Sequence, residues 1–369
     1  MANNTVSYGF IGQEHLFSTR IAEVGTERIF DMVRMSAEAH SRVAMDMMGA
    51  FVERTTVAQE QIELPGDGTL QPLDEWGNPL PVAPSGSYQV AYPIQGGGTA
   101  WGNNRVTRQL MTVEEANRQT WDATQKDANW LIRHMLAAIF TNTTWTYNDK
   151  VAANGQKGLG DITIQPLANN DSVTYLRRGA TSAAADNHYL AQANAISNTD
   201  NPFPAIRAEL IEHPTNGGPF VCYVPSGLTD AIGGLDEFVE IDDPDVMYGA
   251  DSDTLPVAPA QILGPGDEIL GKTKSSNIWI VEWAYLPANY MIAIALGGNG
   301  GPLLKMREYA SPALQGFFPE VSSPDGNLEK MSMIRYAGFG AHNRVKAVVQ
   351  RVGNGSYAIP TGYSAPLAV

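Results

Sequence analysis

Cysteine, charge and long apolar runs are all scarce in this sequence. Cys222 is the one cysteine among 369 residues, which excludes an internal disulfide framework and fits a reducing compartment. Charged residues make up 17% of the chain, below the roughly 25% of an average protein. No run of about eighteen apolar residues occurs, and the N-terminus lacks the basic and apolar stretches of a signal peptide. We therefore expect neither a membrane-spanning helix nor a secretory signal.

The motifs of common enzymes and metal sites are missing as well. The six histidines stand alone in the sequence, without H-x-x-x-H or C-x-x-C partners, so we predict no zinc site. Cys222 lies in the apolar run FVCYV and is expected to be a buried residue. Ser226 lacks the flanking glycines of a nucleophile elbow. We predict no catalytic residues, no cofactor and no resident metal, and hence no enzyme.

The stretch GDEILGKT, residues 266–273, matches the letters of a phosphate-binding loop, G-x-x-x-x-G-K-T. Such a loop needs a helix after it, so that its amide groups face the phosphate. The following residues, KSSNIWIVEW, have the pattern of a strand instead. We interpret this stretch as a structural turn that enters a strand, in which Lys272 and Thr273 complete the motif by chance.

Charge is distributed unevenly along the chain. The formal net charge of −15 disfavours avid, sequence-independent binding to nucleic acid. No lysine precedes Lys126, and the first 125 residues carry eight arginines against fifteen acidic residues. Arginine without lysine indicates specific, planar ion pairs. The acidic run over 240–253 lacks EF-hand spacing, so a solvated loop is favoured over a site for a hard cation.

Two segments have the pattern of long helices. In residues 26–50, four apolar residues fall near one stripe: Ile29, Val33, Val43 and Met47. Residues 112–141 begin with T-V-E-E, in which Thr112 and Glu115 form a capping box. One face of this second segment carries an apolar series: Trp121, Ala128, Ile132, Met135 and Ile139. A helix of this length is a rod of roughly 45 Å, which is long enough to brace a large structure.

A long irregular segment lies between two strand-like runs. Residues 51–62 alternate in polarity, YQVAYPI follows at 88–94, and residues 63–87 between them hold five prolines and four glycines. We predict an extended hairpin whose irregular part is unusually long for a compact monomer. Leu73, Trp76 and Leu80 near its tip would be unusual as solvent-facing residues. We therefore expect a partner outside the monomer to receive them.

The remaining chain is richer in strands. Residues 142–186 are predicted to be loops with the short strands DITIQPL and SVTYLRR, and residues 187–213 have a helical pattern in two pieces. GPFVCYVPSGLTD predicts a buried strand followed by a helix start near Ser226. Five strand-like runs close the chain: NIWIVEWAYLP, YMIAIAL, LLKMREYA, LEKMSMIRYAGFG and RVKAVVQRV. The sequence thus predicts an α+β fold.

This order of parts resembles the major capsid protein of tailed bacteriophages, a fold that encapsulin shells also use. The resemblance implies an N-terminal arm, an extended β-hairpin loop, a long spine helix with peripheral-domain strands, and a mixed α/β axial domain. The implied boundaries are 1–50 for the arm and helix, 51–110 for the extended loop, 111–186 for the peripheral domain with spine helix 112–141 and a loop insertion, 187–302 for the axial domain, 303–344 for the peripheral return strands, and 345–369 for the last axial strand and tail.

Two stretches carry the resemblance in their letters. The first is residues 269–296, which read ILGKTKSSNIWIVEWAYLPANYMIAIAL. Family members have an L-x-G turn, a strand, a Leu-Pro turn and an apolar strand in this order. Leu270 and Gly271 resemble the first turn, although they are adjacent here, and Leu286 and Pro287 resemble the second. LEKMSMIRYAGFG resembles its arginine-containing peripheral strand, with Arg335 as the arginine. Residues 51–111 contain no lysine, so the bond that some members form between a loop lysine and a neighbour's asparagine is not expected here.

The resemblance implies a structural function. Hexamers and pentamers would form an icosahedral virion shell around double-stranded DNA, assembled in the host cytoplasm and without sequence-specific binding. No long scaffold segment precedes the arm in this numbering, so we expect either a separate scaffolding protein or a processed precursor whose first segment the numbering omits. A portal and a cement protein are implied as further partners. At the extended loop the implied inter-subunit contacts are Arg54, Leu73, Trp76, Leu80, Arg105 and Arg108, although ordinary surface charge is the alternative for the arginines. An encapsulin-type compartment and an acidic β-rich enzyme are the alternative functions.

Overall fold

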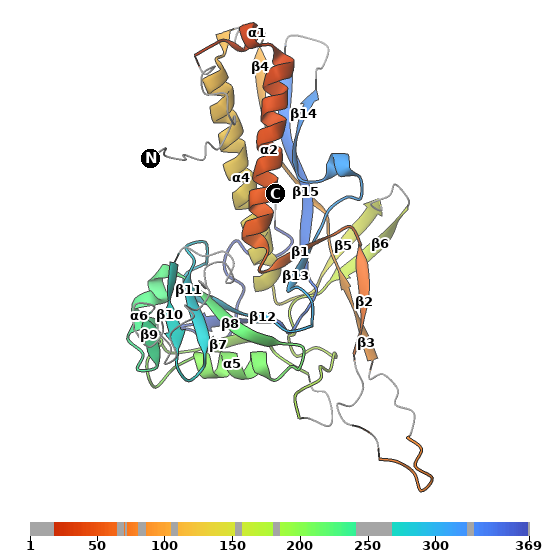
Figure 1. The fold of residues 1–369 in the computed structure, drawn as a ribbon, viewed down its shortest axis with the longest axis vertical. Coiled ribbons are helices and arrows are strands. Elements are labelled where there is room, and N and C mark those ends of the chain that lie inside the picture. Colours follow the sequence, from red (N-terminus) through yellow and green to blue (C-terminus); the bar gives the residue numbers. More distant parts are fainter. Residues whose placement is uncertain are drawn as a thin grey trace, which may run out of the picture.

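Figure 1 shows an elongated molecule in which two long helices stand above a sheet domain and a hairpin projects away from both. It is a computed structural model that describes residues 18–64, 70, 72–79, 86–104, 110–151, 157–179, 185–240, 268–322 and 328–367. The helices are α1 (Ile21–Val24), α2 (Thr26–Met48), α4 (Val113–Phe140), α5 (Phe203–Ile211) and α6 (Thr229–Gly233), with 3-10 turns η2 (Ser226–Leu228) and η4 (Pro312–Leu314). Within these ranges, no helix has the length and apolar character needed to cross a membrane.

Side-chain hydrogen bonds mark both ends of helix α4. The Thr112 hydroxyl accepts a hydrogen bond from the Glu115 amide at 3.3 Å, and the Thr112 amide donates to Glu115 Oε2 at 3.0 Å. These bonds satisfy amides that the first helical turn leaves without partners, as the predicted capping box requires. At the other end the Thr141 hydroxyl donates to the Ala137 carbonyl at 2.7 Å. The predicted long helix is confirmed to within one residue at each end.

The buried face of α4 matches the predicted one in part. Met135 and Ile139 are fully buried, as predicted, but Trp121 is exposed, and nearer the N-terminus the buried side runs through Ala123, Asp127 and Leu131. The apolar pattern alone pointed to Trp121 because it does not anticipate that a carboxylate, Asp127, faces the core. A buried charge is tolerated only where another group pairs with it, and that partner comes from a strand about 200 residues later.

A five-stranded sheet supports the two long helices. Strand β15 is its centre and pairs with β4, β13 and β14, while β1 pairs with β13 in parallel. Helix α4 packs on β15 and helix α2 on β14. The strands of this sheet are β1 (Val52–Thr55), β4 (Gln95–Asn104), β13 (Leu304–Arg307), β14 (Phe317–Ser322) and β15 (Leu328–Ala341).

Strand β4 was not predicted, because its sequence, QGGGTAWGNN, is poor in the residues that favour strands. Ten residues of β4 nevertheless pair with β15, from Gln95 opposite Ala337 to Asn104 opposite Leu328. A Cβ on Gly97 would lie 2.7 Å from Nε1 of Trp130 in α4. The glycines therefore let the indole pack directly on the strand backbone.

A seven-stranded sheet forms the second body. Its strand order is β7, β16, β12, β8, β11, β10 and β9, and apolar clusters cover both faces. The first six residues of the central strand β12 are buried, as expected for a strand covered on both sides. The strands are β7 (Tyr189–Gln192), β8 (Gly217–Val224), β9 (Phe238–Glu240), β10 (Glu268–Thr273), β11 (Ile278–Glu282), β12 (Tyr290–Gly297) and β16 (Ala347–Val352).

The two-piece helix predicted over residues 187–213 is half wrong. Tyr189–Gln192 is strand β7, which pairs in parallel with β16, and only Phe203–Ile211 is helical. The run YLAQ fits either pattern, so its pairing with a strand far along the chain decides the outcome. SVTYLRR, predicted as a strand, forms none in the described residues.

Two hairpins extend from the bodies. Strands β2 (Gln59–Leu64) and β3 (Gly86–Ala91) pair antiparallel, from Gln59 opposite Ala91 to Leu64 opposite Gly86. Strands β5 (Trp145–Val151) and β6 (Lys157–Ile164) form the second hairpin, which includes the predicted strand DITIQPL in part. The β2–β3 pairing confirms that two strands flank the irregular segment, of which the structure describes residues 70 and 72–79.

The residues of GDEILGKT that the structure describes, Glu268–Thr273, form strand β10. The next element is strand β11, which pairs with β10 antiparallel, and not the helix that a phosphate-binding loop requires. The expected turn at Leu270 and Gly271 is wrong, since both residues lie inside β10, where the register shifts between Ile269 and Gly271. A Cβ on Gly271 would lie 2.1 Å from the carbonyl oxygen of Val239. Gly271 therefore permits a close approach of two backbones.

The Gly271→Ala substitution should destabilise the subunit by about 1–3 kcal/mol, because overpacking against backbone atoms forces the strands apart. Gly227→Ala is the matched control, because a Cβ there would contact nothing within 4 Å. Urea unfolding followed by circular dichroism measures both. Equal stability of the two variants would contradict the steric role of Gly271.

Candidate assembly surface

The tip of the long hairpin, residues 72–79, is a small ordered turn. The Asp74 carboxylate accepts hydrogen bonds from the amides of Trp76 at 2.9 Å and Asn78 at 2.7 Å. The Asp74 amide donates to the Asn78 carbonyl at 3.0 Å, and Gly77 supplies the left-handed conformation, with φ of 77°. The Asn78 amide and the other turn donors hold the pKa of Asp74 below its usual value. Hydrogen bonds among its own residues thus give the turn a defined shape.

This turn presents large apolar side chains to solvent. Trp76 is 86% exposed and Leu73 is 63% exposed, and Leu70 nearby is almost fully exposed. Isolated exposed apolar residues are common on proteins, but several of them on one ordered turn form an apolar surface that this subunit does not cover. The predicted exposure of Leu73 and Trp76 in the monomer is therefore found, whereas Leu80 lies outside the described residues.

A second exposed apolar surface lies on α2. Ile29 and Met47 are eighteen residues apart, which is five turns at about 3.6 residues each, so they project in the same direction. Ile29 is buried, but Met47 is 51% exposed and Val43 beside it is also exposed. The predicted stripe is thus continuous along the helix, but the subunit covers only its N-terminal part.

Arg335 lies in β15, as predicted, and its side chain is buried against α4. Its Nε and Nη2 atoms donate to the two oxygens of Asp127 at 2.6 and 2.8 Å. His40 of α2 lies 2.9 Å from Asp127 Oδ2, and Arg335 Nη2 also donates to the Ser41 hydroxyl at 3.2 Å. Burial works to raise the pKa of Asp127, but the His40 hydrogen bond and the Arg335 charge outweigh it and lower that pKa. This network fastens both long helices to the sheet.

Arg54 already has a partner inside the subunit. Its Nη2 lies 2.9 Å from Glu308 Oε2, and about half of the Arg54 side chain remains exposed. Arg54 is therefore not a free cation at the base of the loop, and its contact with a neighbour stays a prediction. Arg105 and Arg108 lie outside the described residues.

Leu286 and Pro287 occupy the turn between β11 and β12. The Leu286 amide donates to the Trp283 carbonyl at 3.1 Å, and the Tyr290 amide donates to the Pro287 carbonyl at 3.2 Å. The Leu286 side chain is buried in the larger apolar cluster. This turn has the form that the resemblance implied, and its role is to reverse the chain between two buried strands.

These elements define a mixed α/β fold with few helices and many strands. Among solved structures the chain is similar to one described as Mycobacterium phage Patience, with a TM-score of 0.66 and 20% identity over 96% of each chain. This likeness shows a shared fold and supports the coarse prediction of a few helices combined with many strands. No protein-family model matches the chain, and no curated protein matches it in sequence.

Two further solved structures match less closely. The asymmetric unit of the bacteriophage PhiM1 mature capsid has a TM-score of 0.46 at 12% identity, over 82% of this chain and 84% of that one. A virus-like particle from Pyrococcus furiosus has a TM-score of 0.40 at 10% identity, over 87% of this chain and 99% of that one.

Proposed function

We propose that this chain is the major capsid protein of a tailed phage, which assembles as hexamers and pentamers into an icosahedral shell around double-stranded DNA. The observation that carries the proposal is the ordered hairpin tip, residues 72–79, on which Leu73 and Trp76 are exposed. A second copy of the chain is the partner that the fold favours. A scaffolding protein, a portal and a cement protein are proposed as further partners in the virion.

The proposed basis of assembly is the area that neighbouring subunits bury against one another. Neither the hairpin tip nor the C-terminal part of the α2 stripe buries its apolar side chains within one subunit. Interfaces of obligate assemblies bury more than ~2,000 Å², and an arm laid across a neighbour reaches that range without a large flat surface. Many such contacts in a closed shell add to one another without any single tight bond. The net charge of −15 leaves the shell without a strong general affinity for DNA.

Electron microscopy and analytical ultracentrifugation of the full chain test this function. We expect capsomers or closed shells as concentration rises, with polyethylene glycol as a crowding agent. Absorbance of shells purified from infected cells separates DNA from protein content, and protein cargo would favour the encapsulin-type alternative. A chain that stays monomeric under every condition and turns over a substrate would support the enzyme instead.

A charge on the exposed part of the α2 stripe should block assembly. The Met47→Lys substitution places an ammonium group in a surface that we expect to be buried between subunits, where an unpaired charge is strongly unfavourable. Glu38→Lys, also on α2 and exposed, is the control. We expect at least a tenfold loss of shells for Met47→Lys, an unchanged melting temperature of the subunit, and little effect of the control. Normal shell yield from Met47→Lys would remove this surface from the proposal.

A further inference from the structure

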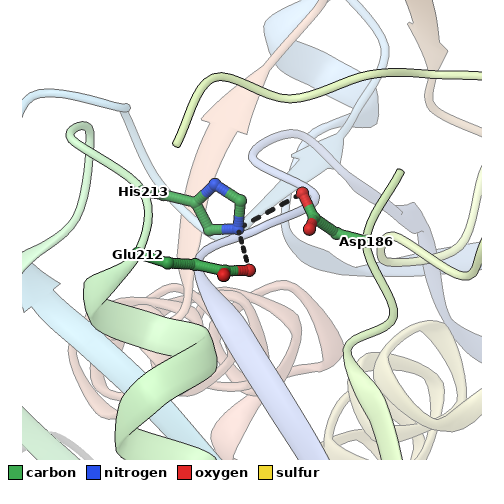
Figure 2. Close-up of side chains that lie close together, drawn as sticks. All are labelled: Asp186, Glu212 and His213. Carbon is green, nitrogen blue, oxygen red and sulfur yellow. Dashed lines mark ion pairs between the residues drawn. The ribbon is translucent and has the colours of Figure 1, made fainter. Parts of the chain in front are cut away.

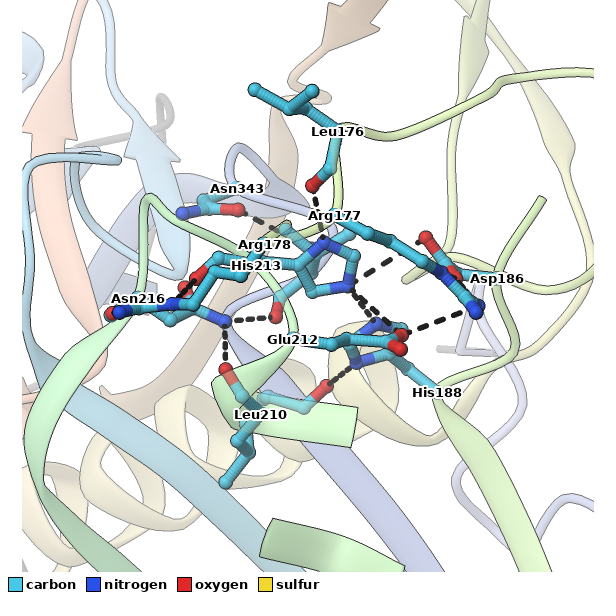
Figure 3. A network of polar contacts seen from close by, with 12 residues as sticks. Leu176, Arg177, Arg178, Asp186, His188, Leu210, Glu212, His213, Asn216 and Asn343 are labelled. Carbon is cyan, nitrogen blue, oxygen red and sulfur yellow. Dashed lines mark hydrogen bonds and ion pairs between the residues drawn. The ribbon is translucent and has the colours of Figure 1, made fainter. Parts of the chain in front are cut away.

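Three side chains that could bind a metal ion meet at the C-terminal end of α5 (Figure 2). Glu212 and His213 directly follow the helix, and Asp186 lies two residues before His188, which precedes β7. One ligand atom from each of Asp186, Glu212 and His213 lies within 4.8 Å of the others. His188 faces the same point, with its Nε2 at 3.2 Å from His213 Nε2 (Figure 3).

The N–H and O–H groups around this point are too few to give every acceptor atom there a hydrogen bond. His188 Nδ1 donates to the Ala347 carbonyl at 2.8 Å, and His213 Nδ1 donates to the Leu176 carbonyl at 3.2 Å. A carbonyl oxygen can only accept, so each neutral ring carries its proton on Nδ1 and directs an Nε2 lone pair at the other ring. Both rings are almost fully buried, which favours their neutral form.

Two carboxylate oxygens add to the excess of acceptors. Asp186 is only 1% exposed, yet its Oδ2 has no hydrogen-bond partner among the described residues. Oε1 of Glu212 is buried without a hydrogen-bond partner as well, although Nη2 of Arg177 lies 3.3 Å from it. Both oxygens lie 3.6 Å from Nε2 of His213. Buried polar atoms left in this way are rare and call for a ligand.

The spacing fits a shared metal ion better than a shared proton. A hydrogen bond to these atoms would bring them to about 2.7–3.2 Å, and 3.6 Å is too long. Four ligands at about 2.0–2.1 Å from a tetrahedral zinc ion lie about 3.3 Å from one another. The separations of 3.2 and 3.6 Å around His213 Nε2 lie close to that value.

The surroundings are those of a ligand set held in place. Both histidines donate their other ring nitrogen to a backbone carbonyl, which is the usual arrangement around metal-bound imidazole. Arg177 Nε donates to Asp186 Oδ1 at 3.0 Å and thereby leaves Oδ2 directed at His213. Glu212 is the C-cap of α5, where the negative end of the helix dipole favours a cation.

The cluster is rich in carboxyl groups. Asp186, Glu209 and Glu212 interact electrostatically here, and Arg177 pairs with Asp186 and Glu212. A divalent cation would add positive charge at the centre of this group. Part of the Glu212 and Arg177 side chains is exposed, which gives an ion a route from solvent.

We propose that Asp186 Oδ2, Glu212 Oε1 and His213 Nε2 bind a divalent cation of the zinc class, with His188 Nε2 beside the fourth coordination position. An imidazole among the ligands selects zinc and similar transition metals over Mg²⁺ and Ca²⁺. The ion would tie the segment before β7 to the turn after α5. It is a structural site, and it stands independently of the proposed assembly.

Metal titration of the full chain tests this site. The chain is treated with a chelator, dialysed, and titrated at pH 7.5 with Zn²⁺ by calorimetry and with Co²⁺ by visible absorbance. We expect one ion per chain, the intense visible bands of tetrahedral Co²⁺, a higher melting temperature with Zn²⁺, and no comparable effect of Mg²⁺. A wild-type chain that binds neither ion overturns the proposal, and this measurement does not depend on any variant.

Variants assign the ligands. His213→Gln and Asp186→Asn should each weaken Zn²⁺ binding by more than about 100-fold, since even outer partners of such sites are worth roughly 10–100-fold. His134→Gln is the matched control, because His134 Nδ1 also bonds a backbone carbonyl, that of Trp130 at 2.9 Å, and His134 lies outside the cluster. Binding that persists in both ligand variants, or that is lost in His134→Gln, would refute the assignment.

Discussion

The Trp76→Ser substitution is expected to leave folding of the subunit unchanged and to abolish shell formation. Trp76 is 86% exposed and contributes no packing to its own subunit, so its removal should change the free energy of unfolding by no more than about 0.5 kcal/mol. An aromatic anchor of this kind commonly accounts for 2 kcal/mol or more of an interface, roughly a 30-fold loss at each contact. Repeated at every contact of a closed shell, that loss should abolish assembly.

A matched pair of leucines separates the tip from exposed apolar residues in general. Leu73 at the tip and Leu159 on β6 are 63% and 59% exposed. Leu73→Ser should reduce shell yield strongly, and Leu159→Ser should leave it near the wild-type level. Yield is measured by sedimentation and by electron microscopy, beside a melting curve for each variant. Full shell yield from a chain carrying both Trp76→Ser and Leu73→Ser would exclude the tip as the assembly contact.

The Asp127→Asn substitution should destabilise the subunit by about 3–5 kcal/mol. It removes the carboxylate that Arg335 binds through two nitrogens, and the buried guanidinium would then keep, among the described carboxylates, only the more distant Glu308 Oε1, 3.9 Å from its Nη1. Asp122→Asn on the same helix is the control, since Asp122 forms an exposed pair with Lys126. An exposed pair of this kind is worth at most about 0.5 kcal/mol. Urea unfolding of unassembled subunits measures both substitutions.

The double variant Asp127→Asn, Arg335→Met tests the mechanism of that loss. It removes the buried charge together with its partner, so it should recover much of the stability lost by Asp127→Asn alone. If the double variant is no more stable than the single one, the cost comes from packing and not from the unpaired charge.

Acid should weaken the same contact. The pKa of Asp127 is lower in the folded subunit than in the unfolded chain, so its contribution to stability is present above the unfolded value near 3.8. That contribution is lost as pH falls through the lower, folded value. Because Asp127→Asn lacks this carboxyl, its stability should fall less steeply than that of the wild-type subunit in this acid range.

Local signals in the sequence were enough for some elements. The capping box of Thr112 and Glu115 lies within four residues, so the start of α4 could be predicted without knowledge of the fold. The apolar runs around Cys222 and in β12 were similarly clear, because strands buried on both faces are apolar throughout. The two strands that flank the irregular segment of the hairpin were predicted from alternating polarity and turn residues alone.

Contacts distant in sequence decided the rest. The glycine-rich β4 is a strand through its pairing with β15, and Trp130 packs against Gly97; the sequence of β4 carries no sign of either contact. Asp127 faces the core because Arg335 lies there, 208 residues later. The absence of a metal site was predicted from isolated histidines, yet Asp186 and His188 meet Glu212 and His213 through the fold. The pairs D-x-H and E-H were the available signal, and each is too short to be specific.

The position of β15 sets the order of events during synthesis. Strand β4 is complete at Asn104, but its partner β15 begins only at Leu328. At roughly 5–20 residues per second, a ribosome needs about 11–45 s to make the chain between them. The parallel partner of β1 is delayed in the same way, since β13 begins at Leu304. A chain that stops before β15 lacks the central strand on which α4 packs. Truncated products are therefore excluded from any assembly that needs the two long helices in place on the five-stranded sheet.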